Sequence, residues 1–240
     1  MHEGIHVIVP LQIGKFDISI TTPVFWSLLA SFVLCVVLFI AVHKLTLIPK
    51  NHFQNLLEIC IEFIEKQILI PADLTNPRWA PFILTIFLFI LFNDWVGILP
   101  GAIPTTSNIN STGSLAILVF IIATFMRFFT KGITGYFKSL VPKGIKGFMI
   151  IFILPLEFIS QLVKPFSLAL RLFANMSAGH LLLLTFIGFT VLFQNIFVNT
   201  LSVAGTVVMS LFELFIGLVQ AYIFAFLSAL FIGESLADEH

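Results

Sequence analysis

The sequence predicts an all-α polytopic membrane protein. We expect upright transmembrane helices, one interfacial amphipathic helix and two long, strongly tilted helices that form a membrane hairpin. Hydrophobic residues make up 59% of the 240 residues and charged residues only 10%, and the mean hydropathy is +1.09. Several apolar runs reach the roughly 18 residues that a spanning helix needs, and the alternation typical of a membrane β-barrel is absent from the sequence. Residues 1–240 are therefore treated as a single membrane domain.

The composition also excludes several kinds of site. The formal net charge is zero, which argues against nucleic acid as a partner. Cys35 and Cys60 lie on different predicted elements without metal-binding or redox spacing, so we expect two free thiols and no metal. No phosphate-binding loop of the GxxxxGK[ST] type occurs, and no basic segment precedes an apolar one at the start, so no signal peptide is expected. The sequence predicts neither a cofactor nor an ATP site.

The first half of the chain divides into an outer N-terminus with a first span (1–50) and an interfacial helix (51–77). The span is expected over Val24–Val42 and ends before His43. In the next segment, three acidic residues recur at helical spacing opposite an apolar face, which is typical of a helix lying in the membrane interface. They are Glu58, Glu62 and Glu65.

Residues 78–147 are predicted to hold the second and third spans and a connector. The second span, 81–99, carries Asn93 and Asp94 near its far end, where a simple interfacial role is as compatible with the sequence as a functional one. An uncharged loop, 100–113, leads to the third span, 114–129, and a basic connector rich in glycine follows.

The distribution of Lys and Arg sets the predicted topology. If the interfacial helix and the connector lie on the same side of the membrane, nine Lys and Arg residues fall on that side and only Lys15 falls on the opposite side. The nine are Lys44, Lys50, Lys66, Arg78, Arg127, Lys131, Lys138, Lys143 and Lys146. The rich side should be cytoplasmic. With five crossings, the N-terminus is expected outside and the C-terminal tail, 234–240, inside.

Residues 148–240 are predicted to form the tilted helical hairpin and the inner tail. The apolar run Phe148–Phe193 would be about 69 Å long as a straight helix and Ile196–Ile232 about 55 Å, against about 30 Å for the hydrocarbon core. Pro155 and Pro165 provide no loop, so we expect strong tilts and a short turn near 194–199.

A permanent cation, Arg171, lies in the middle of the first of these runs. A charge at bilayer depth costs about 3 to 15 kcal/mol unless a partner, a wet cavity or a function compensates it. On a helix, Glu157, Lys164 and Asn175 fall within about 40° of Arg171. His180 points to the opposite face, about 13 Å along the axis, and Glu157 lies about 21 Å away in the other direction. Glu213 and Gln220 belong to a second polar stripe in the final helix.

This pattern indicates a proton pathway. Carboxylates and imidazole exchange protons, whereas arginine keeps its proton and can separate two aqueous routes. The alternative is structural: a buried polar residue often bonds a neighbouring helix, and the cations could pair statically with Glu157 or Asp94. Lys164 could also extend its ammonium group to the inner interface.

The stretch from Lys164 to His180, KPFSLALRLFANMSAGH, resembles the signature of subunit a of the F-type ATP synthases around their essential arginine. Four further segments agree: NDWVGILP, PTTSNIN, KGITGYF and FELFIGLVQAYIFAFL. The resemblance covers nearly the whole chain after about residue 50.

The resemblance implies a non-catalytic stator subunit with two offset half-channels. Arg171 would face the carboxylates of the subunit c ring, with Asn175 lining the same surface and Gln220 near it on the opposing helix. Glu157 would lie in the inner half-channel, and His180 and Glu213 in the outer one. Many bacterial members carry Glu and His in the reverse order at these last two positions, an exchange that keeps one acid and one imidazole.

The same resemblance implies the partners and the location. The partners would be the c ring, the peripheral-stalk subunit b, other ATP synthase subunits and the bilayer. The location would be a bacterial plasma membrane or, as an alternative, the mitochondrial inner membrane. A proton-coupled secondary transporter is the main competing hypothesis, but it would favour internal repeats, and the sequence contains none. A structural membrane scaffold is the third hypothesis.

Overall fold

A computed structural model describes residues 7–10, 12–13, 16–17, 19–42, 52–74, 76–99, 102–139, 148–193 and 195–236. Within them, five helices are long and apolar enough to cross a membrane, which confirms the all-α polytopic class. Several predicted features lie outside the described residues: His43, the second part of the connector between the third span and the hairpin (140–147), Gln194, and the end of the tail (237–240).

Four very short strands precede the first helix, where the sequence predicted no regular structure. β1 (Val7–Val9) pairs antiparallel with β4 (Ile20–Thr21), and β2 (Gln12–Ile13) pairs antiparallel with β3 (Phe16–Asp17). Strands of two or three residues are too short to show a two-residue hydrophobic period, so this pairing left no usable signal in the sequence.

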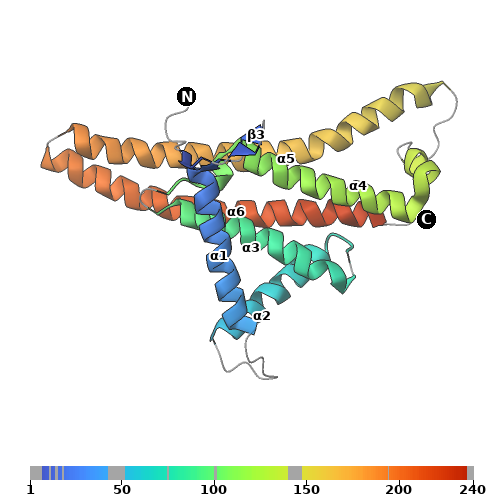
Figure 1. The fold of residues 1–240 in the computed structure, drawn as a ribbon, viewed down its shortest axis with the longest axis horizontal. Helices are drawn as coiled ribbons and strands as arrows, with labels where there is room; N and C mark the ends of the chain where they lie inside the picture. Colours follow the sequence, from blue (N-terminus) through green and yellow to red (C-terminus); the bar gives the residue numbers. More distant parts are fainter. Residues whose placement is uncertain are drawn as a thin grey trace.

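The first three helices follow the predicted order. α1 spans Thr22–Val42, α2 spans His52–Ile64 and continues as a π-helix η1 (Glu65–Leu69), and α3 spans Ala80–Gly97 after the 3-10 turn η2 (Pro77–Trp79). Figure 1 shows α2 crossing the lower ends of α1 and α3. The acidic face of α2 is exposed, and Lys66 pairs with Glu62 at 2.5 Å. The position of α2 in a membrane interface stays a prediction.

The helix α4 (Ile109–Ser139) is longer than the predicted third span at both ends. It starts inside the expected loop because the Asn108 side chain accepts a hydrogen bond from the backbone N–H of Asn110 at 3.0 Å, as residues at helix starts do. Before it lies the 3-10 turn η3 (Thr105–Ser107). At the other end α4 continues into the expected connector, with a break at Gly132, whose φ of 68° suits glycine.

The two long helices form an antiparallel hairpin, as Figure 1 shows. α5 (Met149–Leu192) has 44 residues and contains both Pro155 and Pro165, and α6 (Ile196–Leu236) has 41. The connection is shorter than predicted, because Asn195 accepts a hydrogen bond from the backbone N–H of Phe197 at 2.9 Å and starts α6 at once. The tilt of this hairpin relative to a bilayer stays a prediction.

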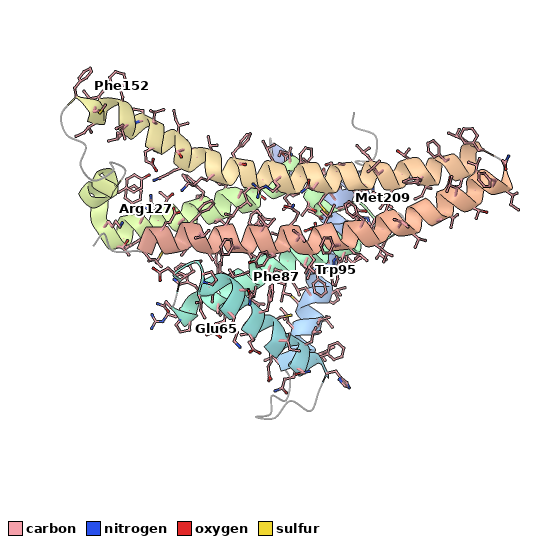
Figure 2. All side chains as sticks on the ribbon, turned by 180° about the vertical axis from the view of Figure 1, so that it is seen from behind. Glu65, Phe87, Trp95, Arg127, Phe152 and Met209 are labelled. Carbon is pink, nitrogen blue, oxygen red and sulfur yellow. The ribbon has the colours of Figure 1, made fainter. Side chains whose placement is uncertain are left out.

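The core is centred on α3 and α6 and also takes buried side chains from α4 and α5. Phe87 and Trp95, labelled in Figure 2, lie on the part of α3 that passes α6. Phe87 is buried in the core, and the exposed Trp95 donates its indole N–H to the carbonyl of Leu214 at 3.3 Å. Close contact continues to the end of α6, where a Cβ built on Gly233 would lie 2.4 Å from the carbonyl oxygen of Ala72. The hairpin is therefore fixed to the rest of the chain along its C-terminal part.

We expect Gly233→Val to destabilise the fold by about 1–3 kcal/mol, because the added side chain would collide with the backbone at Ala72. The thermal denaturation of the detergent-purified protein measures this. Gly188→Val is the matched control, since nothing lies within 4 Å of a Cβ built there. Equal stability of the two variants would contradict the close packing of α6 on the turn after η1.

Candidate functional site

Arg171 is exposed on the surface of α5. Within the described residues it takes part in no ion pair; the two pairs found there are Lys66 with Glu62 and Lys164 with Glu234. Together with Lys164, Ser167 and Glu234, it lines an open groove of about 630 Å³ between α5 and α6, which we call the α5–α6 groove. The guanidinium is thus available to a partner outside this chain.

Lys164 has a different partner from those considered in the sequence. Its Nζ lies 3.3 Å from Glu234 Oε2 on α6, and 5.7 Å from the centre of the Phe231 ring. Neither Glu157 nor Asp94 pairs with it. The reason is the antiparallel hairpin, which brings the end of α6 beside the first half of α5.

Glu157 and Asn175 keep their predicted relation to Arg171, because α5 is continuous through both prolines. Both side chains are half-buried. Glu157 lies toward the start of α5, about 21 Å from Arg171 along the helix. Asn175 follows Arg171 by one turn, in the part of α5 that faces η3: two residues on, the Ser177 hydroxyl donates to the carbonyl of Ser107 at 3.1 Å.

A second polar group lies inside the bundle, and we call Asp94, Glu213 and Thr106 the carboxylate cluster. Asp94 on α3 has no exposed surface and Glu213 on α6 is 2% exposed. Gly217 lets the two helices approach: a Cβ built there would lie 3.1 Å from Asp94 Cβ. The two carboxyl groups are close enough to interact electrostatically, and the Thr106 hydroxyl donates a hydrogen bond to Asp94 Oδ1.

Three carboxyl oxygens in the cluster lack a hydrogen-bond partner within the described part of the chain. They are Asp94 Oδ2 and both oxygens of Glu213. Buried polar atoms are almost always bonded, to protein or to water. Carboxyl groups that remain open in this way are suited to accept and release protons.

His180 lies at the same level of the hairpin as Glu213. Its neighbour Gly179 packs directly on that residue, since a Cβ built on Gly179 would lie 3.3 Å from Glu213 Oε1. The His180 Nδ1 atom is buried without a partner within the described residues. The structure therefore brings the predicted acid and imidazole to one section of α5 and α6.

Gln220 is buried on α6. It lies between Glu213, which packs on Gly179, and Glu234, which pairs with Lys164. On α5, Arg171 lies between Gly179 and Lys164. Gln220 and Arg171 therefore occupy the same section of the hairpin.

Sequence reasoning left Asp94 undecided and did not single out Thr106. The available signal for Asp94 was an acidic residue within an apolar span, which is costly without a function. Its proximity to Glu213 depends on the packing of α3 on α6, which no local pattern encodes. Thr106 belongs to the PTTSNIN segment, which supported the family resemblance without giving this residue a role.

The polar groups thus occupy two regions displaced along the hairpin. The α5–α6 groove lies toward the start of α5, and the carboxylate cluster with His180 lies on the other side of Arg171. Titratable groups on each side of a permanent cation can carry protons up to it from both directions, whereas the arginine itself does not release a proton.

The comparisons with known proteins all point to the same protein family. The model of the family described as ATP synthase A chain matches residues 24–233. Proteins named ATP synthase subunit a from Anaeromyxobacter sp. (strain Fw109-5), Chloroherpeton thalassium and Mesorhizobium japonicum are 36%, 35% and 32% identical to this chain. The alignments cover 96%, 98% and 98% of it. The chain spans 59% of the length of the first relative, 72% of the second and 95% of the third.

We expect a disulfide to form between Asp94→Cys and Gly217→Cys after Cys35 and Cys60 are replaced by serine. The Cβ distance of 3.1 Å needs only a small separation of α3 and α6 to reach the disulfide optimum of about 3.8 Å. Mobility of the oxidised chain on denaturing gels, with and without reductant, reports the bond. Asp94→Cys with Gly188→Cys is the control pair, and equal yields from both pairs would refute the α3–α6 contact.

Proposed function

The chain belongs to the ATP synthase A chain family, and on this basis we propose that it is the proton-translocating stator subunit of a rotary F-type ATP synthase. In this proposal the subunit itself catalyses no reaction. It provides two offset half-channels that reach a ring of c subunits from opposite sides of the membrane.

The observation that carries the proposal is the exposed Arg171. A guanidinium on the surface of a membrane helix is costly when hydrocarbon covers it, and no acidic side chain in the described residues pairs with it. A partner that presents carboxylates inside the membrane would compensate this charge. The carboxylates of a c ring moving past α5 meet that requirement.

The carboxylate cluster and His180 support an outer half-channel. Asp94 on α3 and Glu213 on α6 are buried and His180 on α5 is half-buried, and each has an oxygen or nitrogen without a partner in the described structure. A proton could pass among them with water as the bridging molecule. In the proposal Glu213 and His180 deliver the proton to the ring surface near Gln220 and Asn175.

The α5–α6 groove and Glu157 support an inner half-channel. The groove is open to the surface. It runs from Arg171 to the Lys164–Glu234 pair, which joins the first half of α5 to the C-terminal end of α6. Glu157 lies further along the same helix. Arg171 separates this route from the outer one, so a proton crosses only by riding on the ring.

The proposed partners are the c ring, the peripheral-stalk subunit b and the other subunits of the complex. The proposed location is a bacterial plasma membrane, in line with the bacterial relatives, with the N-terminus outside and the C-terminus inside. This orientation follows from the Lys and Arg distribution.

We expect Arg171→Ala to reduce ATP-driven proton pumping to background while the complex still assembles, because the two routes lose their separating charge. Quenching of a pH-sensitive dye in inverted membrane vesicles measures pumping, and the amount of this chain in the purified complex measures assembly. Arg78→Ala, at an exposed arginine in the turn η2 before α3, is the control and should pump normally. Normal pumping by Arg171→Ala would remove the assignment. Proton conductance that is retained without a ring would favour a secondary transporter.

A second expectation concerns the surface that faces the ring. Ala174→Cys, at an exposed small residue one turn from Arg171, should form a disulfide with a cysteine on the outer face of a ring helix. Leu168→Cys is the control because Leu168 is buried. The expected product is a band of the combined mass that disappears on reduction. A product from the buried position alone would show that another face of α5 meets the ring.

A further inference from the structure

We propose that Thr106 is a positioning residue of the outer half-channel: its hydroxyl fixes the Asp94 carboxyl group and links it to a cavity of mixed polar and apolar lining between α1, α3 and α4. The inference rests on the proposed function. It adds a residue outside the long helices to the path that protons follow.

The first argument is the geometry of Asp94. Thr106 is 1% exposed, and its hydroxyl donates to Asp94 Oδ1. The second oxygen, Oδ2, would lie 3.5 Å from a Cβ built on Gly217, so it is directed at α6 one turn from Glu213. One oxygen is thus held by Thr106 while the other stays open toward the next carboxyl group.

The second argument is the cavity that Thr106 also lines. It has a volume of about 240 Å³, enough for several water molecules at about 30 Å³ each. Six polar residues from four elements contribute to its wall: Ser27, Asn93, Thr105, Thr106, Ser111 and Ser114. The Asn93 Oδ1 atom is buried without a partner in the described structure, as expected where a wall is completed by water.

A threonine hydroxyl suits a position between these two features. It has one proton to donate and two lone pairs that accept. The proton is committed to Asp94, which leaves the lone pairs for a water molecule in the cavity. A proton that arrives through the cavity can therefore reach Asp94 along a continuous set of hydrogen bonds, whereas a valine of the same shape would interrupt it.

The turn η3 does not depend on Thr106 for its position. The Thr105 hydroxyl donates to the carbonyl of Pro23 at 3.1 Å, and the Ser107 hydroxyl donates to the carbonyl of Pro104 at 2.7 Å. Ser177 of α5 holds the same turn through the carbonyl of Ser107. Two hydrogen bonds to other segments, α1 and α5, and one within the turn itself remain when the Thr106 hydroxyl is removed, so its loss should act on Asp94 and not on the fold.

The test compares Thr106→Val with Thr106→Ser in the assembled complex. ATP-driven proton pumping in inverted vesicles, divided by the amount of assembled complex, should fall about tenfold in Thr106→Val. Thr106→Ser keeps the hydroxyl and should stay within about twofold of the original chain. Thr112→Val is the matched control, because Thr112 is also buried but its hydroxyl bonds only its own helix, to the carbonyl of Ile109 at 3.3 Å.

Two outcomes would overturn the inference. One is normal pumping per complex in Thr106→Val, and the other is an equal loss in the valine and serine variants. Arg171→Ala and Glu213→Ala are measured beside them. If those two lose pumping while Thr106→Val does not, only the role of Thr106 is wrong. If all three pump normally, the proposed function is wrong as well.

Discussion

The arrangement of this protein depends on the high free energy of ionised groups in hydrocarbon. Arg171, Asp94 and Glu213 lie within apolar helices, and each has a different environment. The two carboxyl groups are removed from the lipid by the packing of α3, α5 and α6, whereas the guanidinium stays at the surface. Interior groups can be bridged by water, whereas a cation at the surface of a membrane helix is compensated by a partner, by water or by the polar interface. The same physical cost therefore has two different solutions in one chain, and the proposed function assigns a role to each.

Small residues make this burial possible. Gly179 and Gly217 lie against Glu213 and Asp94, at distances that leave little room for a side chain. In membranes, close approach of helices is favoured by small residues because apolar burial alone does not distinguish helix from lipid. Gly179 and Gly217 thus make room for the carboxyl groups as well as for the close packing of the helices.

The helices could be predicted from the sequence because length and hydropathy are local properties. The hairpin of α5 and α6 followed from two apolar runs without a polar interruption, and the structure has them at nearly the expected bounds. The placement of Asp94 could not be predicted in this way, because its packing on α6 joins residues more than one hundred positions apart. The start of α4 was missed although Asn108 is a common type of helix cap. The uncharged polar composition of residues 100–113 is also typical of a loop, and it outweighs a single capping residue as a sequence signal.

The far end of the hairpin has a mechanical consequence. Its side chains are among the most exposed of the described residues, including Val191, Leu192 and Ile196, and Figure 1 shows it extending past α1 and α3. A lateral force on this end would be opposed mainly by the packing of α5 against α6. The section that carries Arg171 and Glu213 also packs against α3 and α4, so the same force would displace it less.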